Sequence, residues 1–120
     1  MKIAEVLEIV EGRLVSGDGA LDLEVWYGAG ADLMSDALRF GREDMLLITG
    51  LTNPQAIRTA EMVGARVVLF VRAKLPPPET VRLAQEASIA LLATRYTLYE
   101  ACGRLYEAGL AGLGLCGEFN

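Results

Sequence analysis

Three short apolar runs in the second half of the chain limit its fold more than any other feature. They cover residues 45–49, 67–71 and 89–93, and none of them alternates between apolar and polar positions. A strand that is buried on both faces has such a continuous run, whereas a half-exposed strand alternates. Each run is followed by a loop and a helical segment, and the runs begin 22 residues apart, at 45, 67 and 89. The spacing fits right-handed strand–helix–strand units. It predicts an α/β fold with a mostly parallel sheet and flanking helices.

The helix boundaries in this repeating part carry local signals. Asn53 precedes Pro54, which places a capping side chain before the residue type favoured at the first helical position. Thr97 and Glu100 match the spacing of a capping box. We therefore expect helices over residues 54–63, about 78–87 and about 97–108.

The first 41 residues are less regular. Along the chain we expect an amphipathic helix over 2–11, a short strand over 13–16, an alternating strand over 21–27, a flexible break over 28–31, and a helix capped by Asp32 that ends near Gly41. The place of residues 13–27 in the sheet stays open at this point. If this part runs antiparallel to the repeating units, the sheet is mixed.

Composition excludes several classes of protein. The chain carries 11 Lys and Arg against 16 Asp and Glu, a net charge of −5, which argues against binding to nucleic-acid backbones. Since it has no His and only two Cys, His-based nucleophilic sites and four-ligand zinc sites are not expected. It has 52% hydrophobic and 22% charged residues, unlike a disordered chain. No signal peptide or membrane segment is expected, and the location predicted is cytoplasmic.

Several segments together are similar to a known family. They are residues 46–55 (LLITGLTNPQ), 94–97 (TRYT), 100–105 (EACGRL) and 27–36 (YGAGADLMSD). This pattern resembles the DRTGG-domain family, whose fold is related to the N-terminal domain of HPr serine kinase/phosphorylase. The short stand-alone members, often encoded near iron-only hydrogenase genes, look most alike. The resemblance covers roughly residues 3–110.

The resemblance implies a non-catalytic regulatory or assembly module, usually dimeric, with no chemical activity of its own. In the family, Gly-Asp-Arg follows the first strand of the series and Thr-Gly-Gly follows the next. Here the corresponding segments read TGLT at 49–52 and VRAK at 71–74. The name-giving residues are absent, so no ligand role attached to them carries over. We expect one DRTGG-like domain over residues 1–110 and a Gly-rich tail over 111–120.

Polar and basic residues follow each of the three apolar runs. In an open parallel sheet, ligands bind outside the carboxyl ends of the strands, and helix N-termini there favour anions. We therefore expect a phosphate or nucleotide site formed by Thr49, Gly50, Thr52, Asn53, Arg72, Lys74, Thr94, Arg95 and Thr97. A simpler interpretation stays open, in which Asn53 and Thr97 only cap helices and the basic side chains are solvated.

The function expected is thus a regulatory or interaction module that self-associates and binds a phosphate-containing small ligand or nucleotide. An alternative is an accessory or assembly factor of an iron-hydrogenase-type complex, with a partner protein of hydrogenase or kinase type. A small phosphotransfer enzyme is disfavoured because no nucleophile–base pair or carboxylate cluster is evident. No catalytic residue, metal ligand or cofactor is predicted. Trp26 and Tyr27 are candidates for the interface between copies, with burial of Trp26 on a second sheet face as the alternative.

Three weaker motifs have simple structural explanations. Gly28-Ala29-Gly30 lacks the third glycine of a dinucleotide fingerprint, because residue 33 is Leu. Asp32 and Asp36 could hold a divalent cation together with Glu43 or Asp44, but such pairs are more often solvated. Cys102 lies on an apolar helix stripe and suits the core, and Cys116 lies in the tail.

Overall fold

The three repeats of the second half build three neighbouring parallel strands of a five-stranded sheet. A computed structural model of the chain describes residues 1–119. Its strands are β1 (Arg13–Ser16), β2 (Tyr27–Gly30), β3 (Met45–Thr49), β4 (Val67–Phe70) and β5 (Ala90–Ala93). Its helices are α1 (Ile3–Ile9), α2 (Met34–Phe40), α3 (Pro54–Val63), α4 (Pro78–Glu86) and α5 (Leu98–Glu107), with a short 3₁₀ helix at Ala20–Asp22.

The sheet order is β1-β5-β4-β3-β2. Neighbouring pairs from β2 to β5 are parallel, with Leu46 opposite Val67 and Val67 opposite Ala90. β1 is antiparallel to β5, with Arg13 opposite Ala93 and a register shift between Leu14 and Ser16. The predicted α/β class and mostly parallel sheet are confirmed, and the sheet is mixed because of β1.

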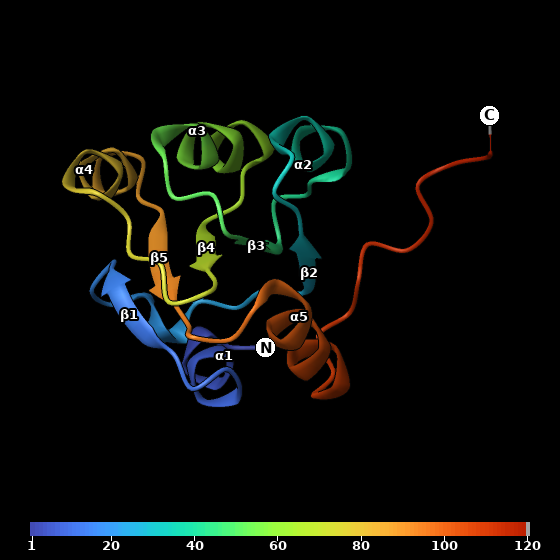
Figure 1. Cartoon of the computed structure of the whole chain (residues 1–120), viewed down its shortest axis with the longest axis horizontal. Helices are drawn as coiled ribbons and strands as arrows, with labels where there is room; N and C mark the ends of the chain where they lie inside the picture. Colours follow the sequence, from blue (N-terminus) through green and yellow to red (C-terminus); the bar gives the residue numbers. More distant parts are fainter. Residues whose placement is uncertain (120) are drawn as a thin grey trace.

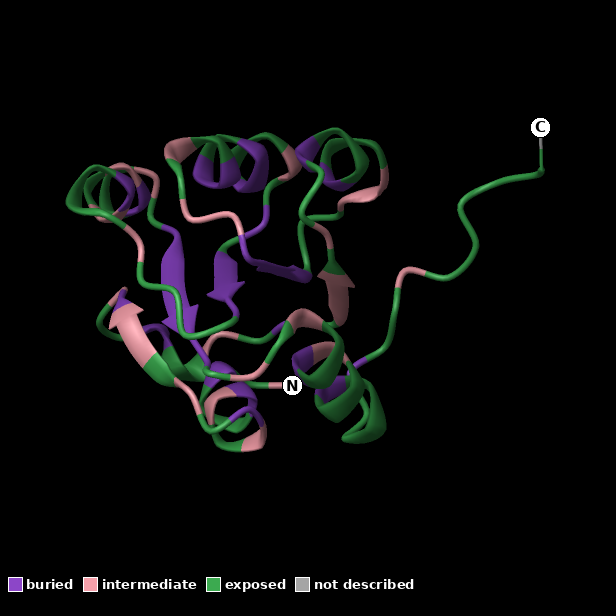
Figure 2. Cartoon of the chain, viewed as in Figure 1, coloured by how far each residue is buried: buried purple, intermediate pink, exposed green. Residues whose placement is uncertain are grey.

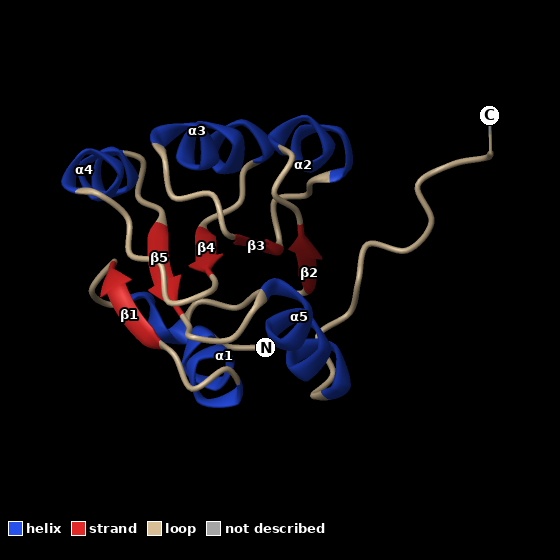
Figure 3. Ribbon diagram, viewed as in Figure 1, coloured by secondary structure: helices blue, strands red, loops and turns tan. Residues whose placement is uncertain are grey.

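Helices cover both faces of the sheet (Figures 1 and 3). Because side chains alternate along a strand, β3 sends Leu46 and Ile48 to one face and Met45 and Leu47 to the other. The first pair packs in a core with α1 and α5, and the second pair in a core with α2, α3 and α4. Figure 2 shows β3, β4 and β5 buried throughout, as the continuous apolar runs predict. The result is a three-layer α/β/α arrangement.

The N-terminal third differs from the sequence prediction in two places. The alternating segment 21–27 is not a strand: its start is the 3₁₀ helix, and Glu24 forms only an isolated bridge with Lys2. Val25 donates from its N–H to Met1 O at 2.8 Å, and Ile3 donates to Leu23 O at 2.9 Å, so this segment pairs with the start of the chain. The strand instead occupies the predicted break, as β2.

The end of the chain leaves the body beside β2. Leu110 is buried, and Ala111 forms a parallel bridge with Tyr27. Beyond it the chain extends away from the three layers (Figure 1). Within residues 1–119, no helix has the length and apolar character that crossing a membrane requires.

Candidate functional site

The carboxyl ends of the parallel strands lie together at one end of the sheet, here called the rim. The loops that follow β3, β4 and β5 are hydrogen-bonded to one another there. Val71 N–H donates to Thr49 O at 3.1 Å, and Ala73 N–H donates to Thr94 O at 3.0 Å. The antiparallel direction of β1 brings its first residue, Arg13, to the same rim, opposite Ala93.

The β3 part of the rim is closed by its own side chains. The Asp32 carboxylate accepts hydrogen bonds from Gly50 N–H at 2.7 Å and from Thr49 Oγ1 at 3.1 Å. Thr49 Oγ1 in turn accepts from Leu51 N–H at 3.1 Å. The predicted capping of α2 by Asp32 is therefore wrong. The Asp32 carboxylate bonds to the loop after β3, and Leu33 occupies the N-cap position without a side-chain bond.

Arg72 covers the neighbouring part of the rim. A Cβ added to Gly50 would lie 2.8 Å from Nη2 of Arg72, so the guanidinium group rests directly on the glycine. Arg72 and Ala73 have φ angles of 63° and 60°, a left-handed backbone that non-glycine residues adopt at a cost. Hydrogen bonds across the rim hold this turn, since Arg72 N–H donates to Tyr96 O at 2.8 Å. In this structure the exposed Arg72 side chain occupies the space directly over Gly50.

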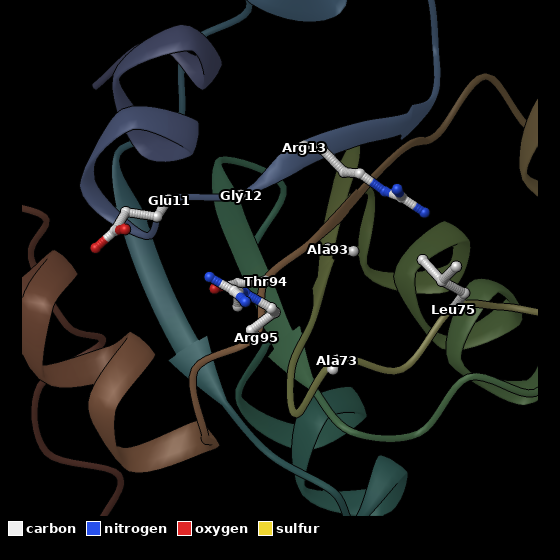
Figure 4. A pocket seen from close by; sticks show the side chains of 8 residues that line it. All are labelled: Glu11, Gly12, Arg13, Ala73, Leu75, Ala93, Thr94 and Arg95. Carbon is white, nitrogen blue, oxygen red and sulfur yellow. The ribbon is translucent and has the colours of Figure 1, made fainter.

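The β5 part of the rim is open. A cavity of about 400 Å³ lies between the α1–β1 turn, the loop after β4 and the loop after β5. Its lining residues are Glu11, Gly12, Arg13, Ala73, Leu75, Ala93, Thr94 and Arg95 (Figure 4). The cavity forms here because the loop after β4 leads to α4 on one face of the sheet, while the loop after β5 leads to α5 on the other. Ligand sites of open α/β sheets lie where successive connections diverge in this way.

Two arginines give this cavity positive charge. In Figure 4 the Arg13 side chain extends in the direction of Leu75, and Arg95 extends the opposite way. Within residues 1–119, neither guanidinium group has a carboxylate within 4.0 Å. In a chain of net charge −5, two unpaired cations beside one cavity are a local concentration of positive charge.

Glu11, the acidic residue of the cavity, already has a partner. Tyr96 donates its hydroxyl hydrogen to Oε2 of Glu11. This bond raises the pKa of Tyr96 above its ordinary value of 10.0, with desolvation as the next cause. The Arg104 guanidinium lies 4.1 Å from the centre of the Tyr96 ring. The Glu11 carboxylate is thereby held against the loop after β5.

The nine predicted site residues divide into three groups. Thr49, Gly50 and Arg72 belong to the closed part, and Thr94 and Arg95 line the cavity. Thr94 is buried, and its hydroxyl donates to Val10 O at 2.7 Å and accepts from Tyr96 N–H at 3.2 Å. The hydroxyls of both Thr49 and Thr94 therefore hold the loops. The other four, which do not line the cavity, are Thr52, Asn53, Lys74 and Thr97.

The predicted caps have different outcomes. Asn53 Oδ1 accepts from Gln55 N–H at 3.1 Å, which confirms the cap of α3. The capping box of α5 is wrong, because Thr97 makes no side-chain cap bond. Glu100 instead lies 3.5 Å from Nε of Arg104, one helical turn further on. Lys74 is exposed, and Thr52 accepts at its carbonyl from Thr80 Oγ1 at 2.9 Å.

Arg13, Glu11 and Leu75 line the cavity but were absent from the predicted site. The sequence rule that ligands bind after parallel strands does not find Arg13, because Arg13 begins an antiparallel strand. The sequence offered one indication. If the strand that begins at residue 13 runs antiparallel to the other strands, its first residue lies at the rim.

The remaining sequence motifs lie elsewhere. Among residues 1–119, no group of three or more Cys, Asp and Glu side chains could hold a metal ion. Trp26 is 59% exposed, which contradicts its burial on a second sheet face. Tyr27 is half-buried, and the Arg42 guanidinium lies 4.3 Å from its ring centre. Burial raises the pKa of the half-buried Cys102 thiol.

Comparison with known proteins places the fold. No protein-family model and no curated protein sequence matches this chain. It is similar to a crystal structure of the CBS and DRTGG domains of the regulatory region of a Clostridium perfringens pyrophosphatase, with a TM-score of 0.76 and 12% identity. The chain has a DRTGG-like fold. The match covers 99% of this chain and 51% of the other, so this DRTGG-like chain spans about half the length of that regulatory fragment.

Proposed function

We propose that this DRTGG-like chain is a non-catalytic regulatory module that binds a phosphate-containing small ligand, of the nucleotide class, in the rim cavity, and that it self-associates. The observation that carries the proposal is the pair of unpaired arginines, Arg13 and Arg95, beside a cavity of about 400 Å³ at the diverging connections of the sheet. Arginine binds phosphate oxygens through paired N–H donors, which makes it the residue type suited to this ligand.

The size and the apolar lining of the cavity favour a nucleotide over inorganic phosphate. Small-molecule sites generally enclose about 300–1,000 Å³ with mostly apolar walls and a few polar groups. Leu75, Ala73 and Ala93 supply apolar surface, and Leu75 is 52% exposed. A base or ribose on this surface, with its phosphates on the arginines, would use both features. Arg72 and Lys74, on the same loop as Leu75, add positive charge nearby.

The structural neighbour gives independent support. Its regulatory region was crystallised with an activator, diadenosine tetraphosphate. That ligand combines adenine bases with a phosphate chain, the chemistry that the rim cavity would recognise. The absence of His from the chain supports a binding rather than a catalytic role.

Titration of the full chain with ATP, ADP and diadenosine tetraphosphate, followed by calorimetry and thermal unfolding, tests the proposal. A ligand at about 100 times its Kd adds about 2.7 kcal/mol to the stability. For a domain of this size that raises Tm by roughly 10 °C. The double variant Arg13→Gln/Arg95→Gln should bind at least about tenfold more weakly, a loss of 1.4 kcal/mol.

The control is Arg66→Gln. Arg66 is exposed and directly precedes β4, so it lies at the amino ends of the parallel strands, away from the rim. Its affinity should stay within about twofold of the parent chain. Failure of all three nucleotides to bind at about 1 mM contradicts the proposal. Equal weakening in Arg66→Gln also contradicts it, because binding would then reflect overall charge.

A further inference from the structure

The sequence after Ala111 alternates as in a β-strand, but this tail is not part of the sheet. Leu113, Leu115 and Phe119 occupy odd positions, interrupted only by Gly117, and Gly, Cys and Glu occupy the even positions between 113 and 119. Period-two alternation is typical of a strand with one apolar face. Leu115 and Phe119 are nevertheless completely exposed, at 99% and 106%. Leu113 is half-buried against the core on the α2 face, so the part of this apolar row that the chain's own body does not bury is Leu115 and Phe119.

β2 is an edge strand whose free side is largely unpaired. Gly28 N–H donates to Ala111 O at 2.8 Å, but the bridge between Tyr27 and Ala111 is isolated. Since alternate residues of a strand point their backbone groups to the same side, Gly30 faces the free side as Gly28 does. Ala31, the next residue, donates inward to Ile48 O at 3.0 Å. An open edge of this kind is a template for another strand.

An apolar groove runs beside this open edge on the α5 face. It has a volume of about 300 Å³, and its walls include Ile48, Cys102, Leu105, Tyr106 and Leu110. Tyr106 is 72% exposed. Exposed tyrosines around an apolar groove are typical of interfaces.

The α2 face of the same edge is less suited to an apolar row. A second groove of about 430 Å³ lies there, but Asp32 and Asp36 contribute to its walls. The tail's own Leu113 also lines it. The apolar row of an incoming strand is therefore expected on the α5 face.

We propose that residues 113–119 of a second copy of this chain add to the open edge of β2 and place their apolar row in the groove on the α5 face. This inference rests on the self-association proposed above and names the segment that produces it. Because each copy carries both the tail and the groove, two copies related by a two-fold axis can exchange tails symmetrically.

The geometry permits this exchange. The tail leaves the body at Ala111, beside the edge that it would bind in the partner (Figure 1). Extended residues advance about 3.3 Å each, so residues 112–119 reach about 26 Å, whereas the four residues of β2 span about 13 Å. The tail is therefore long enough to cross a two-fold axis and still cover β2 of the partner.

The test is the mass of the full chain in solution, measured by light scattering and sedimentation at about 100 µM. We expect a dimer of twice 12.9 kDa. Leu115→Asp/Phe119→Asp should reduce it to a monomer with an unchanged circular dichroism spectrum, because both side chains are exposed in the single copy. Tyr106→Asp should have the same effect from the groove side. Met62→Asp, on α3 and 73% exposed, is the control and should remain dimeric.

Mixing the two defective chains separates tail exchange from a general surface contact. Tyr106→Asp retains its tail, and Leu115→Asp/Phe119→Asp retains its groove, so the mixture should form a heterodimer through one intact contact. A monomeric parent chain, a tail variant that stays dimeric, or a mixture that stays monomeric overturns the inference. Nucleotide binding by the monomeric variants is measured separately, so the rim proposal can fail or hold independently.

Discussion

The β3 part and the β5 part of the rim contain similar residues, but the first is closed by its own side chains and the second borders an open cavity. At β3, Thr49 and Gly50 both donate hydrogen bonds to Asp32, and Arg72 covers Gly50. At β5, Thr94 bonds inward to Val10, while Arg95 and Arg13 border an open cavity. The helices after β3 and β4 pack on the same face, so their loops pack together. The helix after β5 packs on the other face, and its loop separates from the loop after β4.

This difference shows that strand direction alone does not create a cavity. All three loops follow parallel strands, but a cavity forms where the chain changes from one face of the sheet to the other. The two rim threonines also differ in surroundings: Thr94 bonds to a buried carbonyl, whereas Thr49 bonds to the exposed residue Asp32. Their substitution should therefore have unequal effects.

Thr94→Val is expected to cause the largest loss of stability, about 2–4 kcal/mol, because it leaves the Val10 carbonyl without its donor and Tyr96 N–H without its acceptor. Thr49→Val should cost less, about 1–2 kcal/mol: it leaves Leu51 N–H without its acceptor, but the exposed Asp32 carboxylate can bond to water instead. Urea unfolding measures both values. Thr94→Ser keeps the hydroxyl and is the control. Equal losses for the two valine variants would contradict the distinction between the parts.

Arg95→Gln and Arg72→Gln sharpen the comparison by ligand binding. Arg95 lines the cavity and Arg72 rests on Gly50, so the first substitution should weaken nucleotide binding about tenfold and the second about twofold to threefold. Calorimetric titration at fixed salt measures the ratio. If Arg72→Gln has the larger effect, the ligand binds over β3 and β4, and the cavity near β5 is not its site.

The smallest expected effect concerns the titration of Tyr96. Its raised pKa means that the neutral phenol is favoured in the folded protein. The stability that this bond contributes is complete below pH 10.0 and is lost as the pH rises through the higher folded-state pKa. Glu11→Gln removes the largest cause and should lower the Tyr96 pKa toward 10.0. NMR titration of the Tyr96 ring carbons in the parent chain and in Glu11→Gln measures this shift. An unchanged Tyr96 pKa would show that Glu11 does not hold this loop.

Particular contacts explain why the sequence prediction was wrong for two segments of the N-terminal third. The alternation from Leu21 to Tyr27 is a strand pattern, but Leu23 and Val25 find backbone partners at Ile3 and Met1, so the segment joins the N-terminus rather than the sheet. The Gly-rich segment at Gly28 and Gly30 became an edge strand because other side chains fill the space above it. A Cβ on Gly30 would lie 2.6 Å from the Cys102 sulfur, and one on Gly28 would lie 3.0 Å from Leu110.

By itself, the sequence determined the buried strands, their common direction and the end of the sheet at which the loops that follow them lie together. Continuous apolar runs require burial on both faces, and short crossovers require parallel neighbours. Only the tertiary structure decided which face each helix covers, and hence where the rim opens and that Arg13 belongs to it. An apolar stripe drives a helix onto a sheet but carries no information on which of two equally apolar faces receives it. Competition among all five helices for the area of both faces makes that choice.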